Sequence, residues 1–211
     1  MATPRTATLP ERRQTRLAGA PPGPRKRAER SDSLLDSAAA LFVTKGMAAT
    51  SIDDIALHAG VAKGTFYHYF QDRAAMLEAL QARYAQQFAD ATQAAIADCA
   101  DDDWQGKLKA WVACVLREYL ATYPLHDALF HEVEVRHRYA MSELPFVQVL
   151  TTTLAEGERQ GAWRTGNPEM TAVCMFHALH GLVDEALVTG SDTAELAPYL
   201  SRLFLNMVTA R

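Results

Sequence analysis

The stretch that most constrains the fold runs from residue 51 to residue 70, with the sequence SIDDIALHAGVAKGTFYHYF. Ser51 and Asp54 have the spacing of a helix N-cap residue and its capping partner, so a short helix is predicted to begin directly after Ser51. Gly60 ends that helix, because a left-handed turn residue is tolerated best without a Cβ atom. A second short helix follows. The stretch therefore predicts two helices joined by a tight turn.

The second helix, about residues 63 to 69, has an apolar side and a polar side. Phe66 and Phe70 lie four residues apart, so they are predicted to be buried together. The polar side carries a cation, a hydroxyl, a phenol and an imidazole, on Lys63, Thr65, Tyr67 and His68. Such groups bind phosphates and base edges, as a helix-turn-helix does in the major groove. A helix pair with small residues at its crossing is also common in helical bundles, so spacing alone leaves DNA binding open.

Further residues of this segment resemble the amino-terminal pattern of the TetR family of transcriptional repressors. The family pattern is a small-residue helix ending in Gly, followed by T-[V/I]-x-x-I-A-x-x-A-G-V-S-x-G-T-x-Y-x-[H/Y]-F-x-x-K-x-x-L. The matching positions are Gly46, Ser51, Ile52, Ile55, Ala56, Ala59, Gly60, Val61, Gly64, Thr65, Tyr67, Tyr69, Phe70 and Leu77. The resemblance covers about residues 31 to 77.

Two positions depart from the family pattern. Ala62 stands where the family usually has Ser, so the second helix lacks the hydroxyl that would cap it. Arg73 stands where Lys is usual, which keeps the positive charge and can still meet a phosphate. With these positions considered, the residues predicted to bind DNA are Ser51, Lys63, Gly64, Thr65, Tyr67, His68 and Arg73.

The resemblance implies an all-α fold with a three-helix DNA-binding head and a larger helical domain for ligand binding and dimerisation. It also implies a homodimer that binds double-stranded operator DNA of palindromic sequence and is released by a small-molecule effector. The predicted divisions are a disordered basic arm over residues 1–30, the helix-turn-helix domain over 31–77 and the effector and dimerisation domain over 78–211.

The charge distribution agrees with a DNA-binding amino-terminal part. Residues 1–77 hold 11 Lys and Arg against 7 Asp and Glu, whereas residues 78–211 hold 10 against 18. Within the first part, residues 1–30 contain eight basic and two acidic residues and five prolines, which predicts a disordered arm. Two interpretations of this arm stay open: a tail that lies along DNA, or a leader that only adds solubility.

The remainder of the chain reads as a series of helices. Asp72 can cap a helix that has no breaker until about Asp98, so this helix spans roughly 40 Å and must leave the head for the second domain. Two long apolar helices end the chain, and Gly181 in the first of them permits close approach of another helix. The resemblance implies that these two helices form the dimer interface. The other predicted helices span residues 31–45, 101–124, 126–135, 144–161, 167–190 and 192 onward. Asn167 is predicted to cap the helix that ends at about Gly190, and Asp192 is predicted to start the last helix.

The resemblance also implies an effector cavity in the second domain, lined mainly by apolar side chains. An apolar wall with few polar groups favours an apolar or aromatic small molecule, and no cofactor is expected. The predicted lining residues are Trp111, Cys114, His126, Phe130, His131, Phe146 and His177.

Two other functions remain as alternatives. A segment of thirteen residues, 126–138, holds three histidines and three acids, and His177, His180 and Asp184 follow at helical spacing, so a metal-responsive regulator with the same head is one alternative. Solvated helix edges and interface hydrogen bonds would account for the same residues, and no metal site is predicted. A helical enzyme that keeps the head as a relic is the second alternative. The chain contains no phosphate-binding glycine loop, G-x-S-x-G or H-E-x-x-H motif, so we expect no enzyme activity.

The cysteine pattern and the hydropathy indicate a cytoplasmic protein. Cys99, Cys114 and Cys174 lie far apart without a C-x-x-C pair, which favours a reducing compartment. The arginine-rich start is not followed by the apolar segment of a secretory signal. We therefore expect no membrane partner.

Overall fold

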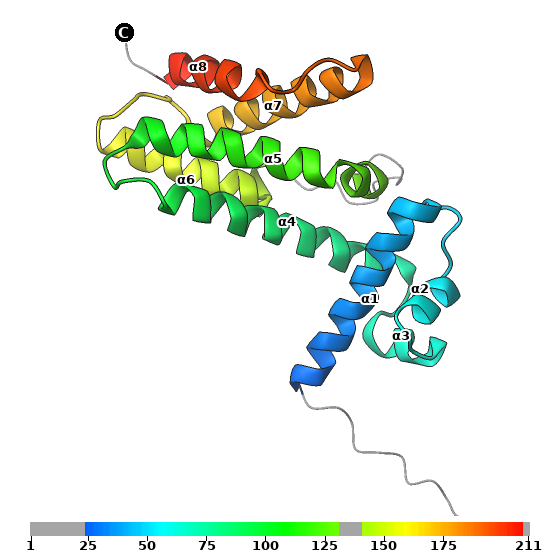
Figure 1. The fold of residues 1–211 in the computed structure, drawn as a ribbon. Coiled ribbons are helices and arrows are strands. Elements are labelled where there is room, and N and C mark those ends of the chain that lie inside the picture. The colour runs from blue at the N-terminus through cyan, green and yellow to red at the C-terminus, as the bar shows by residue number, and fades with distance from the viewer. Residues whose placement is uncertain (1–23, 131–140, 209–211) are drawn as a thin grey trace, which may run out of the picture.

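The computed structural model describes residues 24–130 and 141–208, and its elements in that part of the chain are all helices. The helices form two groups, joined by one long helix (Figure 1). The predicted all-α class is confirmed. The elements are α1 (Pro24–Lys45), α2 (Ile52–His58), α3 (Lys63–Tyr69), α4 (Arg73–Ala97), α5 (Trp104–Phe130), η1 (Met141–Glu143), α6 (Pro145–Arg159), α7 (Pro168–Thr189) and α8 (Leu196–Val208).

The head consists of α1, α2, α3 and the start of α4, packed around one small core. Leu34, Phe42, Ile55 and Phe66 are buried in it. The first helix starts at Pro24, seven residues before the predicted Ser31, so the last part of the predicted disordered arm is helical. Proline is well placed at the first position of a helix, and the basic residues and alanine that follow are good helix formers. Sequence analysis missed this turn because it carries no apolar stripe.

The start of α2 is fixed by the predicted cap. The Ser51 hydroxyl accepts a hydrogen bond from the Asp54 backbone N–H at 3.1 Å, and the Asp54 carboxylate accepts one from the Ser51 backbone N–H at 2.8 Å. These two bonds form a capping box. At α3 the N-cap residue, Ala62, makes no side-chain hydrogen bond, as its replacement of the usual serine predicts.

The long helix α4 links the head to the body, the helical group that contains α4 to α8. Asp72 caps it, since its carboxylate accepts a hydrogen bond from the Ala75 backbone N–H at 2.8 Å. With 25 residues it spans about 38 Å at 1.5 Å per residue. Its first turns belong to the head, and the rest packs on α5 and α6 (Figure 1). The predicted link between the two groups is confirmed.

Helix α5 corrects one prediction. The sequence predicts one helix that ends at Tyr123 and Pro124 and a separate one that starts at His126, but α5 runs unbroken through Pro124 to Phe130. Proline removes one backbone hydrogen bond and bends a helix without always ending it. Figure 1 shows the last turns of α5 turned away from its main axis. Buried residues on both sides of the proline, including Tyr119 and Leu129, offset the lost hydrogen bond. Residues 131–135 of the predicted separate helix lie outside the described residues.

The two carboxyl-terminal helices, α7 and α8, cover the side of the body away from the head (Figure 1). Asn167 caps α7 through a bond from the Met170 backbone N–H at 3.0 Å, and Gly190 ends it with a φ of 67°, both as predicted. The last helix begins at Leu196, later than the predicted Asp192, because Asp192 instead closes a turn by accepting the Ala194 N–H at 2.9 Å.

Among the described residues, α7 alone is long and apolar enough to cross a membrane by length and composition. The core helix of a soluble protein passes the same test, so this property is weak evidence for a membrane segment. One side of α7 is buried in the body core, where Met175, Leu179 and Val183 pack.

Candidate DNA-binding surface and effector cavity

Helix α3 presents its polar side to solvent, as predicted. Phe66 is fully buried and Phe70 is buried beside it, with their ring centroids 5.5 Å apart. The Tyr67 side chain is 50% exposed, and Lys63 and His68 are exposed as well. Gly64 is exposed with open space around it, and Thr65 is half-buried. The packing of the two phenylalanines thus fixes which side of α3 faces solvent. DNA contact by the polar residues on that side stays a prediction.

Lys63 forms an ion pair within the head. Its ammonium lies 2.9 Å from the Asp53 carboxylate on α2, and this contact raises the pKa of Lys63 above its usual value. Both side chains are exposed, so water screens the pair and it contributes little to stability. The pair nevertheless places a carboxylate beside the cation predicted to meet phosphate.

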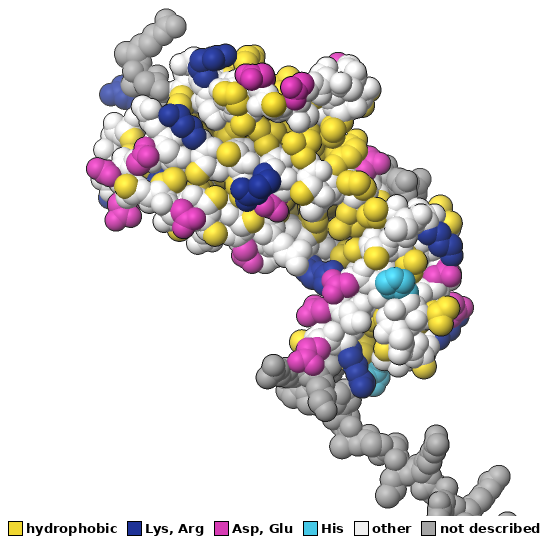
Figure 2. Space-filling model, in the orientation of Figure 1, with side chains coloured by type: hydrophobic (Ala, Val, Ile, Leu, Met, Phe, Trp, Pro, Cys, Tyr) yellow, Lys and Arg dark blue, Asp and Glu magenta, His cyan; other side chains and the backbone are white. Residues whose placement is uncertain are grey.

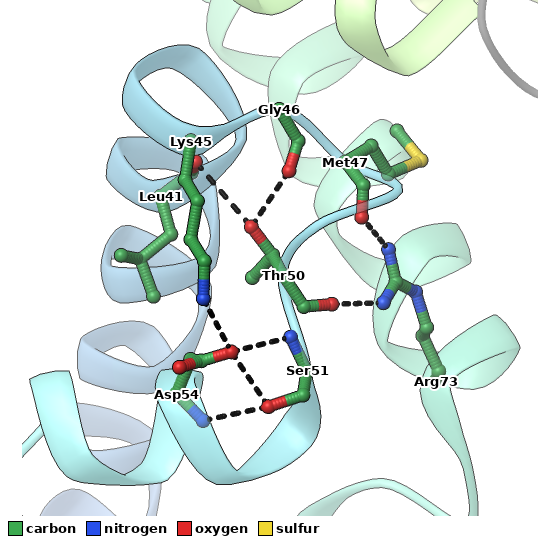
Figure 3. A network of polar contacts seen from close by, with 8 residues as sticks. All are labelled: Leu41, Lys45, Gly46, Met47, Thr50, Ser51, Asp54 and Arg73. Carbon is green, nitrogen blue, oxygen red and sulfur yellow. Dashed lines mark hydrogen bonds and ion pairs between the residues drawn. The ribbon is translucent and has the colours of Figure 1, made fainter.

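Arg73 holds the loop between α1 and α2 against α4 (Figure 3). Its guanidinium donates hydrogen bonds to the backbone carbonyls of Met47 and Thr50, and it lies 5.6 Å from the centre of the Phe42 ring. The Thr50 hydroxyl closes the same loop by donating to the Gly46 carbonyl at 2.8 Å. Sequence analysis assigned Arg73 only to phosphate binding and missed this structural contact, while its phosphate contact stays a prediction.

Ser51, also predicted to bind DNA, uses its hydroxyl inside the capping box. It accepts from the Asp54 N–H and lies 2.6 Å from the Asp54 carboxylate, to which it donates (Figure 3). The Lys45 ammonium lies 2.9 Å from the same carboxylate. Lys45 and Ser51 together hold the pKa of Asp54 well below its usual value, so Asp54 stays ionised.

A cavity of about 530 Å³ lies in the body between α4, α5, the η1–α6 segment and α7. Its wall is mainly aromatic and aliphatic, and neighbouring rings pack against one another: the Phe88 and Phe146 centroids are 5.2 Å apart, and those of Phe146 and Phe176 are 5.0 Å apart. The size and the apolar wall are typical of a small-molecule site. The lining side chains include Tyr84, Phe88, Val115, Tyr119, His126, Phe130, Leu144, Phe146, Phe176, Leu179 and His180.

A row of polar side chains lies along the α5 and α7 side of the cavity. The Tyr119 hydroxyl donates to one Asp184 oxygen at 2.7 Å, and His180 Nδ1 lies 3.1 Å from the other. His180 Nε2 lies 3.3 Å from Nε2 of His126, so one proton between the two rings makes a hydrogen bond. Burial, with the bond to Asp184, raises the pKa of Tyr119 far above its usual value, so this phenol remains a donor. The row can fix the orientation of a polar group in the cavity.

The amino-terminal head is similar to a known family of DNA-binding domains. Residues 34–80 match the model of the bacterial regulatory proteins of the tetR family. The head of this chain therefore matches the TetR family. The match falls on α1 to α4, the same elements that carry the pattern seen in the sequence.

Individual relatives give the extent of the likeness for this chain. It is 42% identical over 59 residues to the HTH-type transcriptional repressor KstR2 of Mycolicibacterium smegmatis, covering 28% of this chain and only 29% of that relative. It is 28% identical over 145 residues to KstR2 of Rhodococcus jostii, covering 64% of this chain and 69% of the relative. The fold resembles the FadR regulator of Bacillus subtilis in complex with stearoyl-CoA, with a TM-score of 0.69 and 20% identity over 83% of this chain and 98% of that one.

The cavity in the body is lined by some of the predicted residues and not by others. His126, Phe130 and Phe146 line it. Trp111 and Cys114 are instead buried and do not line the cavity. Trp111 lies one turn before the lining residue Val115, and Cys114 lies on a different side of α5. His177 is exposed on the outer side of α7, since the buried side of that helix passes through Phe176 and Leu179. His131 lies outside the described residues.

Several lining residues were missed as effector contacts. Tyr84, Phe88 and Tyr119 were read only as parts of helices, and His180 was considered only for a metal or an interface. The spacing of Phe176 and His180, four residues apart on α7, was a usable signal that both face the same way. Within residues 24–130 and 141–208, no group of three or more His, Cys, Asp or Glu side chains is placed to hold a metal ion.

Proposed function

We propose that this protein is a one-component transcriptional regulator that represses by binding a palindromic operator as a homodimer. A small apolar or aromatic effector, bound in the cavity, releases it from DNA. The observation that carries this proposal is the position of the last turns of α5, which line the cavity and also pack in the head core.

The end of α5 offers a short physical route between the two sites. His126 and Phe130 line the cavity, whereas Ala128 and Leu129 are buried in the head core. The Gln81 side-chain amide on α4 donates to the Leu129 carbonyl at 2.8 Å, which ties this segment to the linking helix. An effector that displaces the cavity side of these turns also displaces their head side. By linkage, an effector that binds the displaced arrangement more tightly weakens DNA binding by the same factor by which DNA weakens effector binding.

The exposed faces of α7 and α8 support the homodimer. Met170 and Val188 on α7 are 60% and 80% exposed, and Gly181 between them has open space where a Cβ atom would lie. Along α8, Tyr199, Leu203 and Met207 recur every fourth residue and are also exposed. Figure 2 shows hydrophobic side chains gathered on the face that carries α5, α7 and α8. Contiguous exposed apolar surface of this kind marks an interaction site, and two copies paired through α7 and α8 would cover it.

Two recognition helices in such a dimer would read two half-sites. The exposed polar side of α3 carries the groups suited to major-groove contacts. In a two-fold dimer the half-sites lie about one turn of DNA, or a multiple, apart. This requirement accounts for the expected palindromic operator.

The cavity wall defines the effector class. Its described lining contains no Lys or Arg, so a strongly anionic group gains no ion pair from these residues. Burial of an apolar body gives about 25 cal/mol per Å², and the His126–His180 pair can orient one polar group. The stearoyl chain bound by the Bacillus subtilis neighbour is apolar in this sense. We therefore expect an aromatic compound or a free acyl chain, and neither a sugar nor a nucleotide such as the coenzyme A part of that neighbour's ligand.

A combined thermal-shift and DNA-release screen tests this function. Ala82 lies exposed on α4 at the cavity, so Ala82→Trp should obstruct it without overfilling the core. We expect apolar and aromatic ligands to raise the melting temperature and release operator DNA from the unaltered protein. Ala82→Trp should weaken that response about tenfold or more, since obstructed burial of roughly 60 Å² costs about 1.4 kcal/mol. Ala113→Trp, an exposed position on α5 outside the cavity, is the matched control. A response confined to sugars or phosphorylated ligands would show that the proposed effector class is wrong.

A further inference from the structure

Aromatic side chains form a closed belt along the wall of the cavity. On one half of this aromatic belt, the ring centroids of Tyr84 and Phe88 are 6.1 Å apart, and those of Phe88 and Phe146 are 5.2 Å apart. The belt continues from Phe146 to Phe176 at 5.0 Å and from Phe176 to His180 at 5.6 Å. Each of these side chains lines the cavity. The rings therefore follow one another without a gap from α4 through α6 to α7.

The other half of the belt returns to its starting point. The centroids of His180 and Tyr119 are 4.6 Å apart, and those of Tyr119 and His126 are 4.7 Å apart. Phe130 lies 4.9 Å from His126 and 6.0 Å from Tyr84, which closes the loop. These side chains also line the cavity. The aromatic belt thus consists of eight rings from four helices, all within contact distance of their neighbours.

Negative charge lies beside the aromatic belt. The Tyr119 hydroxyl and His180 Nδ1 are directed to the two oxygens of Asp184, at 2.7 and 3.1 Å. A carboxylate that accepts hydrogen bonds from ring donors polarises those rings and increases their electron density. The described cavity lining contains two carboxylates, Glu78 and Glu143, and no Lys or Arg. The charges of the described lining therefore favour a positively charged group in the cavity.

An organic cation fits both the rings and the charges. The face of an aromatic ring is negative, and it attracts a cation that lies within about 6 Å of the ring centre. Because neighbouring centroids of the belt are 4.6 to 6.1 Å apart, a cation that lies against the belt is close to several rings at once. This attraction is strongest where water is excluded, as in an apolar cavity. A carboxylate gains no such attraction from the rings, and the lining carboxylates repel it.

We propose that the effector is an aromatic compound that carries a positively charged group, such as a quaternary or tertiary ammonium. The aromatic belt holds the cation, and the aliphatic part of the wall covers the rest of the molecule. The proposal rests on the proposed effector site and narrows its ligand class. It selects an aromatic cation over a free acyl chain, because the carboxylate of the acyl chain has the opposite charge.

Three ligands that share one hydroxymethylphenyl body test the preference for positive charge. The cation is para-(trimethylammonio)benzyl alcohol, its uncharged isostere is para-tert-butylbenzyl alcohol, and the anion is para-carboxybenzyl alcohol. Calorimetry measures their affinities for the full-length protein at about pH 8, where an unperturbed imidazole is neutral. We expect the cation to bind at least about tenfold more tightly than the isostere, and the anion to bind most weakly. Equal or tighter binding of the isostere would overturn the proposal, as would a protein that binds none of the three.

Two variants assign the preference to the belt and to the charge beside it. Phe176→Leu removes one ring and keeps an apolar side chain, and Asp184→Asn removes the carboxylate and keeps an acceptor for Tyr119. Each should lower the ratio of cation to isostere affinity about threefold or more, whereas a loss of packing alone would lower both affinities together. Phe204→Leu, at a buried position outside the cavity, and Asp98→Asn, at an exposed one, are the matched controls. An unchanged ratio in both test variants would show that the belt does not select the cation.

Release of DNA separates this proposal from the proposed function. The full-length protein first selects a duplex from a random-sequence library, and each of the three ligands is then added to the complex. If the isostere binds and releases the duplex as well as the cation does, the effector site stands and the charge preference is wrong. If the cation binds with the expected preference and releases no DNA, the ligand class stands and the proposed regulation is wrong.

Discussion

The head and the body of this protein place their candidate sites in opposite ways. The head buries its aromatic residues and carries its candidate DNA contacts outside, on the seven residues of α3. The body turns aromatic residues toward a cavity lined by residues of α4, α5, α6 and α7. A site on one short helix depends on local sequence, whereas a site between four helices depends on how distant segments pack. Because the two sites consist of different residues, a substitution can change one site directly and leave the residues of the other site unchanged.

The two regions meet at one point. Leu125 and Phe130, on either side of the last turns of α5, pack against both the head core and the body core. These turns follow Pro124, where a missing backbone hydrogen bond makes a helix easier to bend. A compliant segment between two cores is suited to carry a displacement from one to the other.

The largest expected effect comes from separating the two subunits, which the body is proposed to hold together. Gly181→Arg places a long charged side chain on the exposed side of α7, where the partner subunit is proposed to pack. We expect a monomer in sedimentation analysis. Operator affinity should fall by about 10²- to 10⁴-fold, because a single head loses the effective concentration that the second head provides.

Gly181→Ala is the matched control for this variant. A Cβ atom at position 181 meets nothing within 4 Å in the subunit, so alanine should be accepted and should strengthen α7 by up to about 1 kcal/mol. The alanine variant should remain a dimer with unchanged operator affinity. A dimeric Gly181→Arg protein would place the interface elsewhere.

The difference between the two regions also explains what could be predicted from sequence. The capping box at Ser51, the buried Phe66 and the exposed Tyr67 follow from spacings of three or four residues, and the structure agrees with all of them. The caps at Asp72 and Asn167 are equally local and were also correct. Local hydrogen bonds and helical periodicity determine such features, so a single sequence suffices for them.

The cavity could be predicted only in part, because its wall depends on the rotation of each helix about its own axis. Trp111 and Cys114 have the apolar character of lining residues, yet α5 turns them into the core. His177 differs from His180 by three residues, but only His180 faces the cavity. Continuation of α5 through Pro124 likewise depends on burial of Leu129 against the distant α1. Apart from the four-residue spacing of Phe176 and His180 on α7, none of these contacts is encoded in local spacing.

A second prediction tests the head alone. Tyr67→Ala removes a half-exposed side chain from α3, so the fold should remain intact. We expect operator affinity to fall about tenfold or more through lost contacts to phosphate or base edges. Lys63→Ala should weaken binding less and reduce the salt slope by about one per site.

Phe66→Ala is the contrasting change at the neighbouring position. Phe66 is fully buried, and its truncation should cost about 3–5 kcal/mol of unfolding free energy. Gel-shift titrations and chemical denaturation on all three variants separate a loss of DNA contact from a loss of folding stability. Unchanged operator affinity for both Tyr67→Ala and Lys63→Ala would show that α3 is not the recognition helix.

The third prediction separates two roles of Arg73: holding the loop between α1 and α2, and binding a DNA phosphate. Its guanidinium donates to two carbonyls of the loop between α1 and α2, and lysine cannot reproduce that fork. Arg73→Lys keeps the positive charge, so we expect a loss of about 1–2 kcal/mol of unfolding free energy with little change in salt slope. Denaturant unfolding and salt-dependent binding on the same variant check this. If instead the slope falls by about one per site while stability holds, Arg73 acts mainly on phosphate.

The smallest effect concerns the cap of α2 and depends on pH. Contacts with Lys45 and Ser51 hold the pKa of Asp54 well below its ordinary value of 3.8. A carboxyl group with a lowered pKa in the folded protein stabilises it above the unfolded value and loses that effect as the pH falls toward the folded one. Asp54→Asn should therefore lower the melting temperature by about 2 °C at pH 7. The difference in melting temperature between the unaltered protein and the variant should stay constant to about pH 5 and become smaller below it. Asp102→Asn, an exposed position before α5, controls for the loss of one negative charge. Thermal melts from pH 7 to pH 3 test this prediction. A difference in melting temperature that grows toward low pH would be incompatible with an ionised Asp54 at the cap.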